Sequence, residues 1–270
     1  MFYKGATISI FLLLSIIISA QAVRQFFLGR HKKHGFLLPP KKDPTYKNGK
    51  DAVLHFFQQN LDHFSAYPGS WRQRYWVTDK FYSDGGPGFL FYGGEAPADP
   101  GWIDGNPRQA FWEGSAKTHS AMMFELEHRY YGVSHPPTAD MSTANMRFLS
   151  SQQALADIAT FIKAMNKEYN LSKWVVFGGS YSGALAAWTK EIYPELIVGA
   201  IGSSGPVWAK LNYYEYFEVV SASLATKGTQ ACVNNIQQAT NKLEELMQTE
   251  SGRATIKEKF KLCTDLDLSQ

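Results

Sequence analysis

Cysteine and histidine are both scarce in this 270-residue chain, and the places where they are missing limit its chemistry. The chain has two cysteines, Cys232 and Cys263, and seven histidines, the last of which is His135. The histidines do not show the spacing of four by which one helix holds a metal ion with two imidazoles, which argues against that class of metal site. The glycine-rich segments lack the lysine of a P-loop, which argues against nucleotide binding of that type.

An excess of charge of either sign is also missing. Lysine and arginine number 27 against 24 acidic residues, so the formal net charge is only +3. This value is too small to indicate a nucleic-acid or membrane-surface partner. The basic residues gather at 30–50, in "RHKKHGFLLPPKKDPTYKNGK". We interpret residues 23–52 as an exposed leader before the first strand, with a propeptide or a polyanion-binding patch as the alternative.

A long apolar run is absent, but a short one stands at the N-terminus. Lys4 precedes an apolar segment at 8–18, and Ala20-Gln21-Ala22 forms a small-x-small cleavage site. The segment is shorter than the ~20 residues of a membrane-spanning helix. We therefore predict a signal peptide at 1–22, entry into the secretory pathway, and no stable membrane span.

The secretory pathway permits disulfides and glycans. Cys232 and Cys263 are expected to pair either with each other or with cysteines that this sequence does not contain. Asn170 begins the Asn-Leu-Ser sequon, and we expect it to carry a glycan at a loop-like junction.

Strand-like and helix-like segments alternate through the middle of the chain. Such alternation predicts an α/β fold with a mostly parallel sheet and helices on both faces. From about residue 210 two amphipathic helices, at 213–225 and 233–248, follow one another without strands between them, which indicates a helical insertion or cap. The expected strands are an outer one at 72–78 and buried ones at 88–94, 121–132, 174–179 and 197–207, and the expected helices are at 107–118, 150–169 and 182–192.

Two serines lie at the junction of a strand and a helix in "VVFGGSYSGALAAW" (175–188). A nucleophile at such a sharp turn needs small neighbours two positions before and after it. Ser180 has Gly178 before it and Ser182 after it, whereas Ser182 lies a step into the helix. We therefore assign Ser180 as the nucleophile and Ser182 as the small residue or helix cap.

Donors for an oxyanion are expected on both sides of this turn. The amide of Tyr181 stands at the helix N-terminus, where the helix dipole supports negative charge. A second donor should come from a loop after an earlier strand, and Gly94 in "LFYGGEAP" (90–97) fits. Two other glycine-rich segments, at 84–88 and 202–205, are interpreted as a turn entering a strand and as a strand-end loop.

Five motifs occur together in this chain: "FGGSYSGALAAW" (177–188), "EHRYYG" (127–132), "SSQQALAD" (150–157), "NLDHF" (60–64) and "SSGPV" (203–207). With these motifs the chain resembles the lysosomal Pro-Xaa carboxypeptidase family of serine peptidases, and the thymus-specific branch most. The resemblance implies an α/β-hydrolase core, a helical cap inserted after the nucleophile half, and exopeptidase action next to proline, of carboxypeptidase or dipeptidyl-peptidase type. It assigns family roles to Ser180 and Tyr181, and more loosely to Gly94. Gln152 departs from the glutamate of many members.

The role of "EHRYYG" stays open between a salt-bridged strand end around Glu127 and Arg129 and direct contact with substrate. The family's catalytic aspartate and histidine have no counterpart, because no histidine follows Ser180. We expect residues 53–209 to form the N-terminal part of the hydrolase domain and residues 210–270 the start of the cap. The C-terminal part of the fold is then missing, and the chain as written is expected to be an inactive, poorly stable fragment.

Three functional hypotheses follow. The first is a secreted or lysosomal serine exopeptidase that acts on proline-containing peptides without a cofactor and whose full chain supplies the aspartate and histidine. The second is a catalytically silent secreted protein that binds peptides or a partner. The third is a generic esterase, which the serine turn supports alone.

Overall fold

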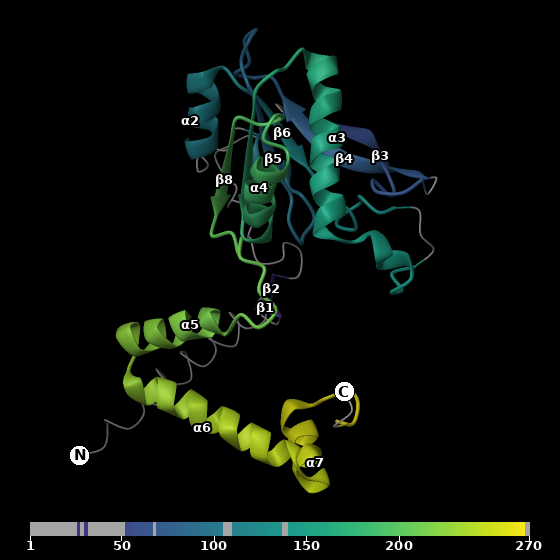
Figure 1. Cartoon of the computed structure of the whole chain (residues 1–270). Coiled ribbons are helices and arrows are strands. Elements are labelled where there is room, and N and C mark those ends of the chain that lie inside the picture. The colour runs from purple at the N-terminus through teal and green to yellow at the C-terminus, as the bar shows by residue number, and fades with distance from the viewer. Residues whose placement is uncertain are drawn as a thin grey trace, which may run out of the picture. The chain divides into compact units, whose positions relative to one another are not determined.

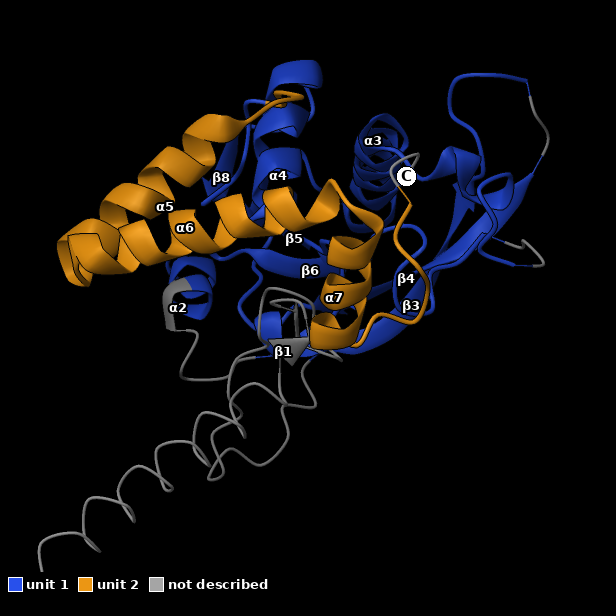
Figure 2. Cartoon of the chain, turned by 90° about the horizontal axis from the view of Figure 1, so that it is seen from below, with its two compact units in different colours: residues 1–208 blue, residues 209–270 orange. Residues whose placement is uncertain are grey.

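The computed structural model describes residues 52–66, 69–104, 110–136 and 140–267, together with the backbone of the short strands β1 (Phe26–Phe27) and β2 (Arg30–His31). The signal peptide expected at 1–22 and most of the leader at 23–52 lie outside the described residues. The chain divides into two compact units, residues 1–208 and 209–270 (Figure 2). The division falls one residue before the expected boundary.

Unit 1 is built on a six-stranded sheet in the order β3-β4-β6-β5-β7-β8 (Figure 1). β3 pairs antiparallel with β4, and β4 antiparallel with β6, whereas β6, β5, β7 and β8 run parallel. This arrangement, with helices on both faces, is that of an α/β-hydrolase core and confirms the predicted fold class. The strands are β3 (Val53–Asn60), β4 (Ser70–Thr78), β5 (Gly88–Tyr92), β6 (Met122–Leu126), β7 (Trp174–Gly179) and β8 (Gly199–Ser203).

Hydrophobic clusters cover both faces of the sheet. Side chains of β5 alternate, so that Leu90 enters the cluster that also contains residues of α3 (Ser151–Tyr169) and α4 (Tyr181–Ile192). Phe91 enters the opposite cluster with residues of α2 (Ala110–His119) and of the 3-10 helix η1 (Pro100–Trp102). All five residues of β5 are buried, as expected for a central parallel strand.

Three strands differ from their prediction. The strand predicted as outer, β4, is internal, because β3 covers it and forms the edge itself. The segment at 121–132 is a strand only as far as Leu126, since Tyr130 and Gly132 have positive φ angles of 66° and 59° and turn the chain. The strand predicted as buried at 197–207 is β8, which is exposed from Ile201 to Ser203 because it stands at the other edge.

Helix α3 begins where the sequence predicts. The Ser150 hydroxyl accepts a hydrogen bond from the Gln153 amide at 3.2 Å and caps the helix. Asn170 ends α3 in the left-handed conformation, with φ 53°, and is exposed. The predicted glycan would therefore stand at an accessible helix end, and its presence stays a prediction.

Glu125 of β6 is a buried acid, 1% exposed, inside unit 1. The Asp99 amide donates to its Oε1 at 2.9 Å, and its Oε2 makes no hydrogen bond among the described residues. Burial raises the pKa of Glu125 well above its usual 4.5, and the charges of Asp99 and Glu127 add to the effect. The folded protein therefore binds this proton more tightly than the unfolded chain does.

The substitution Glu125→Gln is expected to stabilise unit 1 at neutral pH. The folded protein gains stability because it binds the Glu125 proton more tightly than the unfolded chain does. This contribution is fully present below the unfolded pKa of Glu125 and is lost as the pH rises toward the raised folded pKa. Across that interval the variant should gain ~1.4 kcal/mol over the parent per pH unit. Urea unfolding at pH 4 and pH 7 checks this, with equal stabilities expected at pH 4. A constant difference at both values would contradict it, and Glu113→Gln, on the surface of α2, provides the control.

Unit 2 consists of three helices, α5 (Tyr214–Lys227), α6 (Gln230–Met247) and α7 (Glu250–Phe260). Thr229 caps α6 by accepting from the Cys232 amide at 3.1 Å, and Arg253 of α7 donates to the Met247 carbonyl at 2.9 Å. The sequence predicted the first two helices and missed α7, which is short and rich in charged residues. No helix among the described residues is long and apolar enough to cross a membrane.

The two cysteines are free thiols in the structure, so the predicted mutual disulfide is not formed. Cys232 lies at the start of α6, and Cys263 follows α7. Pairing with cysteines outside this sequence stays a prediction.

Candidate active site

Ser180 stands at the turn between β7 and α4 with an unusual backbone conformation. Its φ and ψ angles are 58° and −127°, outside the regions that residues with a side chain adopt at low cost. The Ser180 amide donates to the Ser203 carbonyl of β8 at 2.9 Å, which holds the turn against the neighbouring strand. Such a strained turn from strand to helix projects a serine hydroxyl above the sheet edge.

Two glycines allow the helix to start this close to the strand. A Cβ atom on Gly178 would overlap the Ser182 carbonyl and lie 2.8 Å from the Gly183 nitrogen. A Cβ atom on Gly183 would lie 2.9 Å from the Ser203 carbonyl oxygen. Both distances are shorter than real Cβ contacts, so glycine is required at both positions for steric reasons.

The two serines of the turn have different environments. Ser182 is fully buried, and its Oγ donates to the Gly179 carbonyl at 2.9 Å and accepts from the Gly179 amide at 3.0 Å. Ser180 is half-buried, and no described side chain hydrogen-bonds to its hydroxyl. The arrangement makes Ser182 a local structural cap and leaves the Ser180 hydroxyl available for reaction.

The loop after β5 approaches the same turn. A Cβ atom on Gly94 would lie 3.6 Å from Ser182 Cβ and 3.7 Å from its nitrogen, which places Gly94 against the first turn of α4. The Gly93 amide is already bonded to the Leu126 carbonyl at 2.9 Å. Amides at a helix start lack intrahelical acceptors, and Tyr181 is the first residue of α4. The structure thus brings the two expected oxyanion residues, Tyr181 and Gly94, to one place.

Three of the sequence motifs meet in one buried ion-pair network. Arg129 donates to both carboxylate oxygens of Asp157, from Nε at 2.6 Å and from Nη2 at 2.7 Å. His63 Nε2 lies 2.7 Å from the same carboxylate. The Arg129 guanidinium also donates to the backbone carbonyls of Leu61 and Phe148 at 3.1 and 3.0 Å. Arg129 and Asp157 are both fully buried, so this network joins "NLDHF", "EHRYYG" and "SSQQALAD" inside the domain.

The acidic residue of "EHRYYG" has a separate partner. Glu127 forms an ion pair with Arg74 of β4 and accepts from the Val133 amide at 3.1 Å. Of the two roles left open for this motif, the geometry of Glu127 and Arg129 fits the salt-bridged strand end. Gln152, the residue that departs from the family, is exposed in the first turn of α3 and takes no part in the network.

A third residue of the motif reaches the serine turn. His128 Nε2 lies 3.1 Å from the Tyr181 hydroxyl, and the Ser151 hydroxyl lies 3.3 Å from the same oxygen. Neither the His128 nor the Ser151 side chain was given a function from the sequence. The sequence indicated these two residues only as members of the motifs "EHRYYG" and "SSQQALAD".

The histidines of the described residues leave Ser180 without a base. His63 is engaged with Asp157 and His128 with Tyr181. The rings of His55, His119 and His135 lie against Tyr75, Phe89 and Tyr130, respectively. Among the residues that the structure describes, no group of three or more histidine, cysteine or acidic side chains could hold a metal ion.

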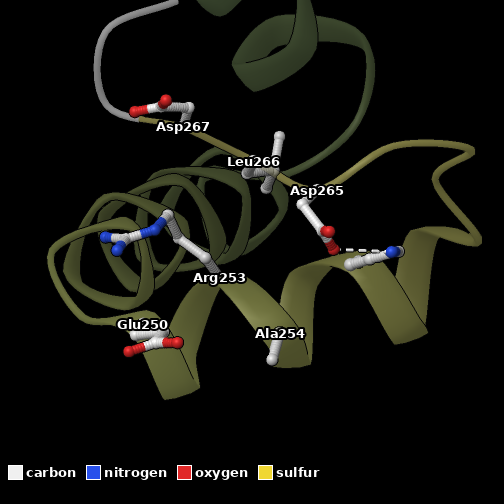
Figure 3. Close-up of a pocket in the computed structure, with 7 residues that line it drawn as sticks. Glu250, Arg253, Ala254, Asp265, Leu266 and Asp267 are labelled. Atoms are coloured by element: carbon white, nitrogen blue, oxygen red, sulfur yellow. Dashed lines mark hydrogen bonds and ion pairs between the residues drawn. The ribbon is translucent and has the colours of Figure 1, made fainter.

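A surface hollow in unit 2 combines both signs of charge (Figure 3). Lys257 of α7 and Asp265 of the following segment form an ion pair of 2.6 Å across it. None of its lining residues belongs to the serine turn, so it adds nothing to the chemistry of Ser180. The residues that line it are Glu250, Arg253, Ala254, Lys257, Asp265, Leu266 and Asp267.

Comparison with known proteins places the chain in a family. The family model described as serine carboxypeptidase S28 matches residues 59–270. A Caenorhabditis elegans protein named as a serine protease is 42% identical over 250 residues, which are 91% of this chain and 48% of the relative. The human thymus-specific serine protease is 36% identical over 78% of this chain and 42% of its own length.

Two further similarities complete the comparison. The human lysosomal Pro-X carboxypeptidase is 32% identical over 80% of this chain and 45% of its own length. Among solved structures, an esterase from Pyrococcus furiosus aligns with 76% of this chain and 68% of its own, at 12% identity and a TM-score of 0.43. The chain spans about half the length of the curated relatives it matches. Because the family model covers most of the sequence, the chain belongs to the serine carboxypeptidase S28 family of serine peptidases.

Proposed function

We propose that this chain carries the nucleophile of a serine exopeptidase and that Ser180 is the residue that attacks. The observation that carries the proposal is the strained conformation of Ser180 at the β7–α4 turn, with its hydroxyl left out of the hydrogen bonds that occupy Ser182. Membership of a serine peptidase family supports the same assignment.

The reaction follows from this geometry. Ser180 Oγ attacks the carbonyl carbon of the scissile peptide bond while a general base takes its proton. The negative charge that develops on the carbonyl oxygen is stabilised by the Tyr181 amide and by a second amide at Gly94. The base returns the proton to the leaving amine, and water then hydrolyses the acyl-enzyme with the same base accepting the water's proton.

We propose that the general base and its orienting acid lie outside residues 1–270. The last histidine of this sequence precedes Ser180, and His63 and His128 bind Asp157 and Tyr181 instead. General-base catalysis is worth ~10²–10⁴-fold, so the 270-residue chain alone should be nearly inactive. Residues 209–270 would be the start of the cap that leads to the missing groups.

The proposed substrates are peptides with proline next to the scissile bond. Support comes from the name of a relative, a lysosomal Pro-X carboxypeptidase, with 32% identity to this chain. The same relative supports a place in the lysosome or the secretory pathway. The two possible polarities are removal of a C-terminal residue after proline and removal of an N-terminal dipeptide that ends in proline.

The proposal is tested by assaying three substrates with the protein translated from the full transcript that includes residues 1–270. They are a peptide ending in Pro-Phe, a peptide beginning with Ala-Pro, and a p-nitrophenyl ester. Cleavage of one peptide next to proline is expected, with products identified by mass spectrometry. Cleavage of the ester alone would instead indicate a generic esterase.

One observation favours a second candidate, a catalytically silent peptide-binding protein. No histidine side chain among the described residues touches Ser180. Several independent transcripts that stop directly after codon 270, together with peptide binding that Ser180→Ala leaves unchanged, would establish this alternative and reject the peptidase.

A further inference from the structure

The Tyr181 side chain is tied to the strand layer beneath the serine turn. Its hydroxyl lies 3.1 Å from His128 Nε2, and His128 is the second residue after β6. The Ser151 hydroxyl, from the first residue of α3, lies 3.3 Å from the same oxygen. The Tyr181 side chain thus connects the start of α4 to the segment after β6 and to the start of α3, two elements that are distant in the sequence.

The direction of these hydrogen bonds follows from the second histidine nitrogen. His128 Nδ1 lies 2.7 Å from the Arg129 carbonyl oxygen, which can only accept, so Nδ1 carries the proton. Burial lowers the pKa of His128 to about 4, so the ring is neutral above pH 5. Nε2 is then an acceptor, and the Tyr181 hydroxyl donates to it. The Ser151 hydroxyl can donate in turn to the Tyr181 oxygen.

We propose that His128 is a positioning residue, which holds the Tyr181 side chain so that the Tyr181 amide points at the oxyanion. This inference rests on the proposed function, since it gives a role within the reaction of Ser180. The amide in question lies in the peptide plane between Ser180 and Tyr181. The orientation of that plane is set by the Ser180 ψ of −127°, a value outside the ordinary regions.

Three ties hold this peptide plane in place. The Ser180 amide is bonded to the Ser203 carbonyl on β8, and Ser182 is bonded to Gly179 within the turn. The hydrogen bond between the Tyr181 hydroxyl and His128 is the third and anchors the turn to the segment after β6. An oxyanion donor acts only if it is already aimed before the charge develops, so a loosened plane lowers the rate without weakening ground-state binding.

The test compares Tyr181→Phe with Tyr130→Phe in the product of the full transcript. Tyr130 is a matched control, because its hydroxyl donates to the Asn145 carbonyl at 2.7 Å and does not touch Tyr181. Tyr181→Phe is expected to lower kcat ~10-fold with KM nearly unchanged, a fraction of the ~10²–10³-fold for complete loss of an oxyanion donor. Tyr130→Phe should leave both constants near the parent values. Equal kcat in the two variants would overturn the inference.

Two NMR measurements on the 270-residue chain need no turnover. Nitrogen-15 shifts of labelled histidine should show His128 with the proton on Nδ1, and a proton on Nε2 would overturn the inference. Hydrogen exchange of the Ser180 amide should be faster in Tyr181→Phe and unchanged in Tyr130→Phe, and equal exchange in both would also overturn it. Failure of the proposed function looks different, because Ser180→Ala would then retain full turnover.

Discussion

Replacing Ser180 with alanine is expected to lower peptide turnover by ~10⁴-fold or more in the full-transcript product, which we propose carries the general base. The substitution removes the attacking oxygen and leaves the fold intact, because no described side chain depends on the Ser180 hydroxyl. Alanine accepts the positive φ of 58° no worse than serine does. The measurement is kcat on the proline peptide, with thermal unfolding recorded for both proteins.

Ser182→Ala provides the matched comparison two positions away. It removes a fully buried hydroxyl that bonds the Gly179 amide and carbonyl, so the expected cost is stability, ~1–3 kcal/mol. Its turnover should stay within ~10-fold of the parent, because the Ser180 hydroxyl is still present. Loss of turnover in Ser182→Ala with activity retained in Ser180→Ala would reverse the assignment of the nucleophile.

The second large effect concerns the buried network at Asp157. Asp157→Asn should lower the free energy of unfolding by ~3–5 kcal/mol, because it leaves the Arg129 guanidinium buried without its anionic partner. His63 loses the same carboxylate. Since small domains have ~5–15 kcal/mol of stability in total, this one oxygen-to-nitrogen exchange removes a large part of it. Urea unfolding followed by tryptophan fluorescence measures the change.

A partly exposed ion pair in the same unit gives the control. Glu113→Gln breaks its 3.4 Å contact with Lys80, and ion pairs near the surface are worth ~0–1 kcal/mol. The double variant Arg129→Met with Asp157→Leu should cost less than the sum of its single variants, since it leaves neither charge unpaired. Additive costs, or an Asp157→Asn effect no larger than that of Glu113→Gln, would show that the network contributes little.

The serine turn was predictable because its signals are local. A run of β-branched and aromatic residues, two glycines and a helical pattern lie within one short segment, and β7 spans the predicted 174–179. The elements with weak local signals were missed or wrong. The burial of β3 alternates, but its more buried face carries the polar His55 and Gln59, and its exposed face carries Leu54 and Phe56. Its sequence therefore lacks the apolar–polar alternation of a half-buried strand. β8 reads as apolar but stands at an edge, and only the topology could show that.

The supporting contacts were beyond the reach of sequence patterns for a different reason. His63 and Asp157 are 94 residues apart, and His128 and Tyr181 are 53 apart. Which buried charge meets which partner depends on strand order and helix placement. The motifs "NLDHF", "EHRYYG" and "SSQQALAD" indicated a family, while the buried ion pairs that join them became visible only in the fold.

The most direct test of the account is to locate a covalent adduct. The 270-residue chain and the product of the full transcript would each be treated with a fluorophosphonate, digested, and mapped by mass spectrometry. The account predicts an adduct on Ser180 in the full product, formed at least ~10²-fold more slowly in the 270-residue chain because the base is lacking. An adduct on Ser182, or equal labelling rates in the two proteins, would contradict it.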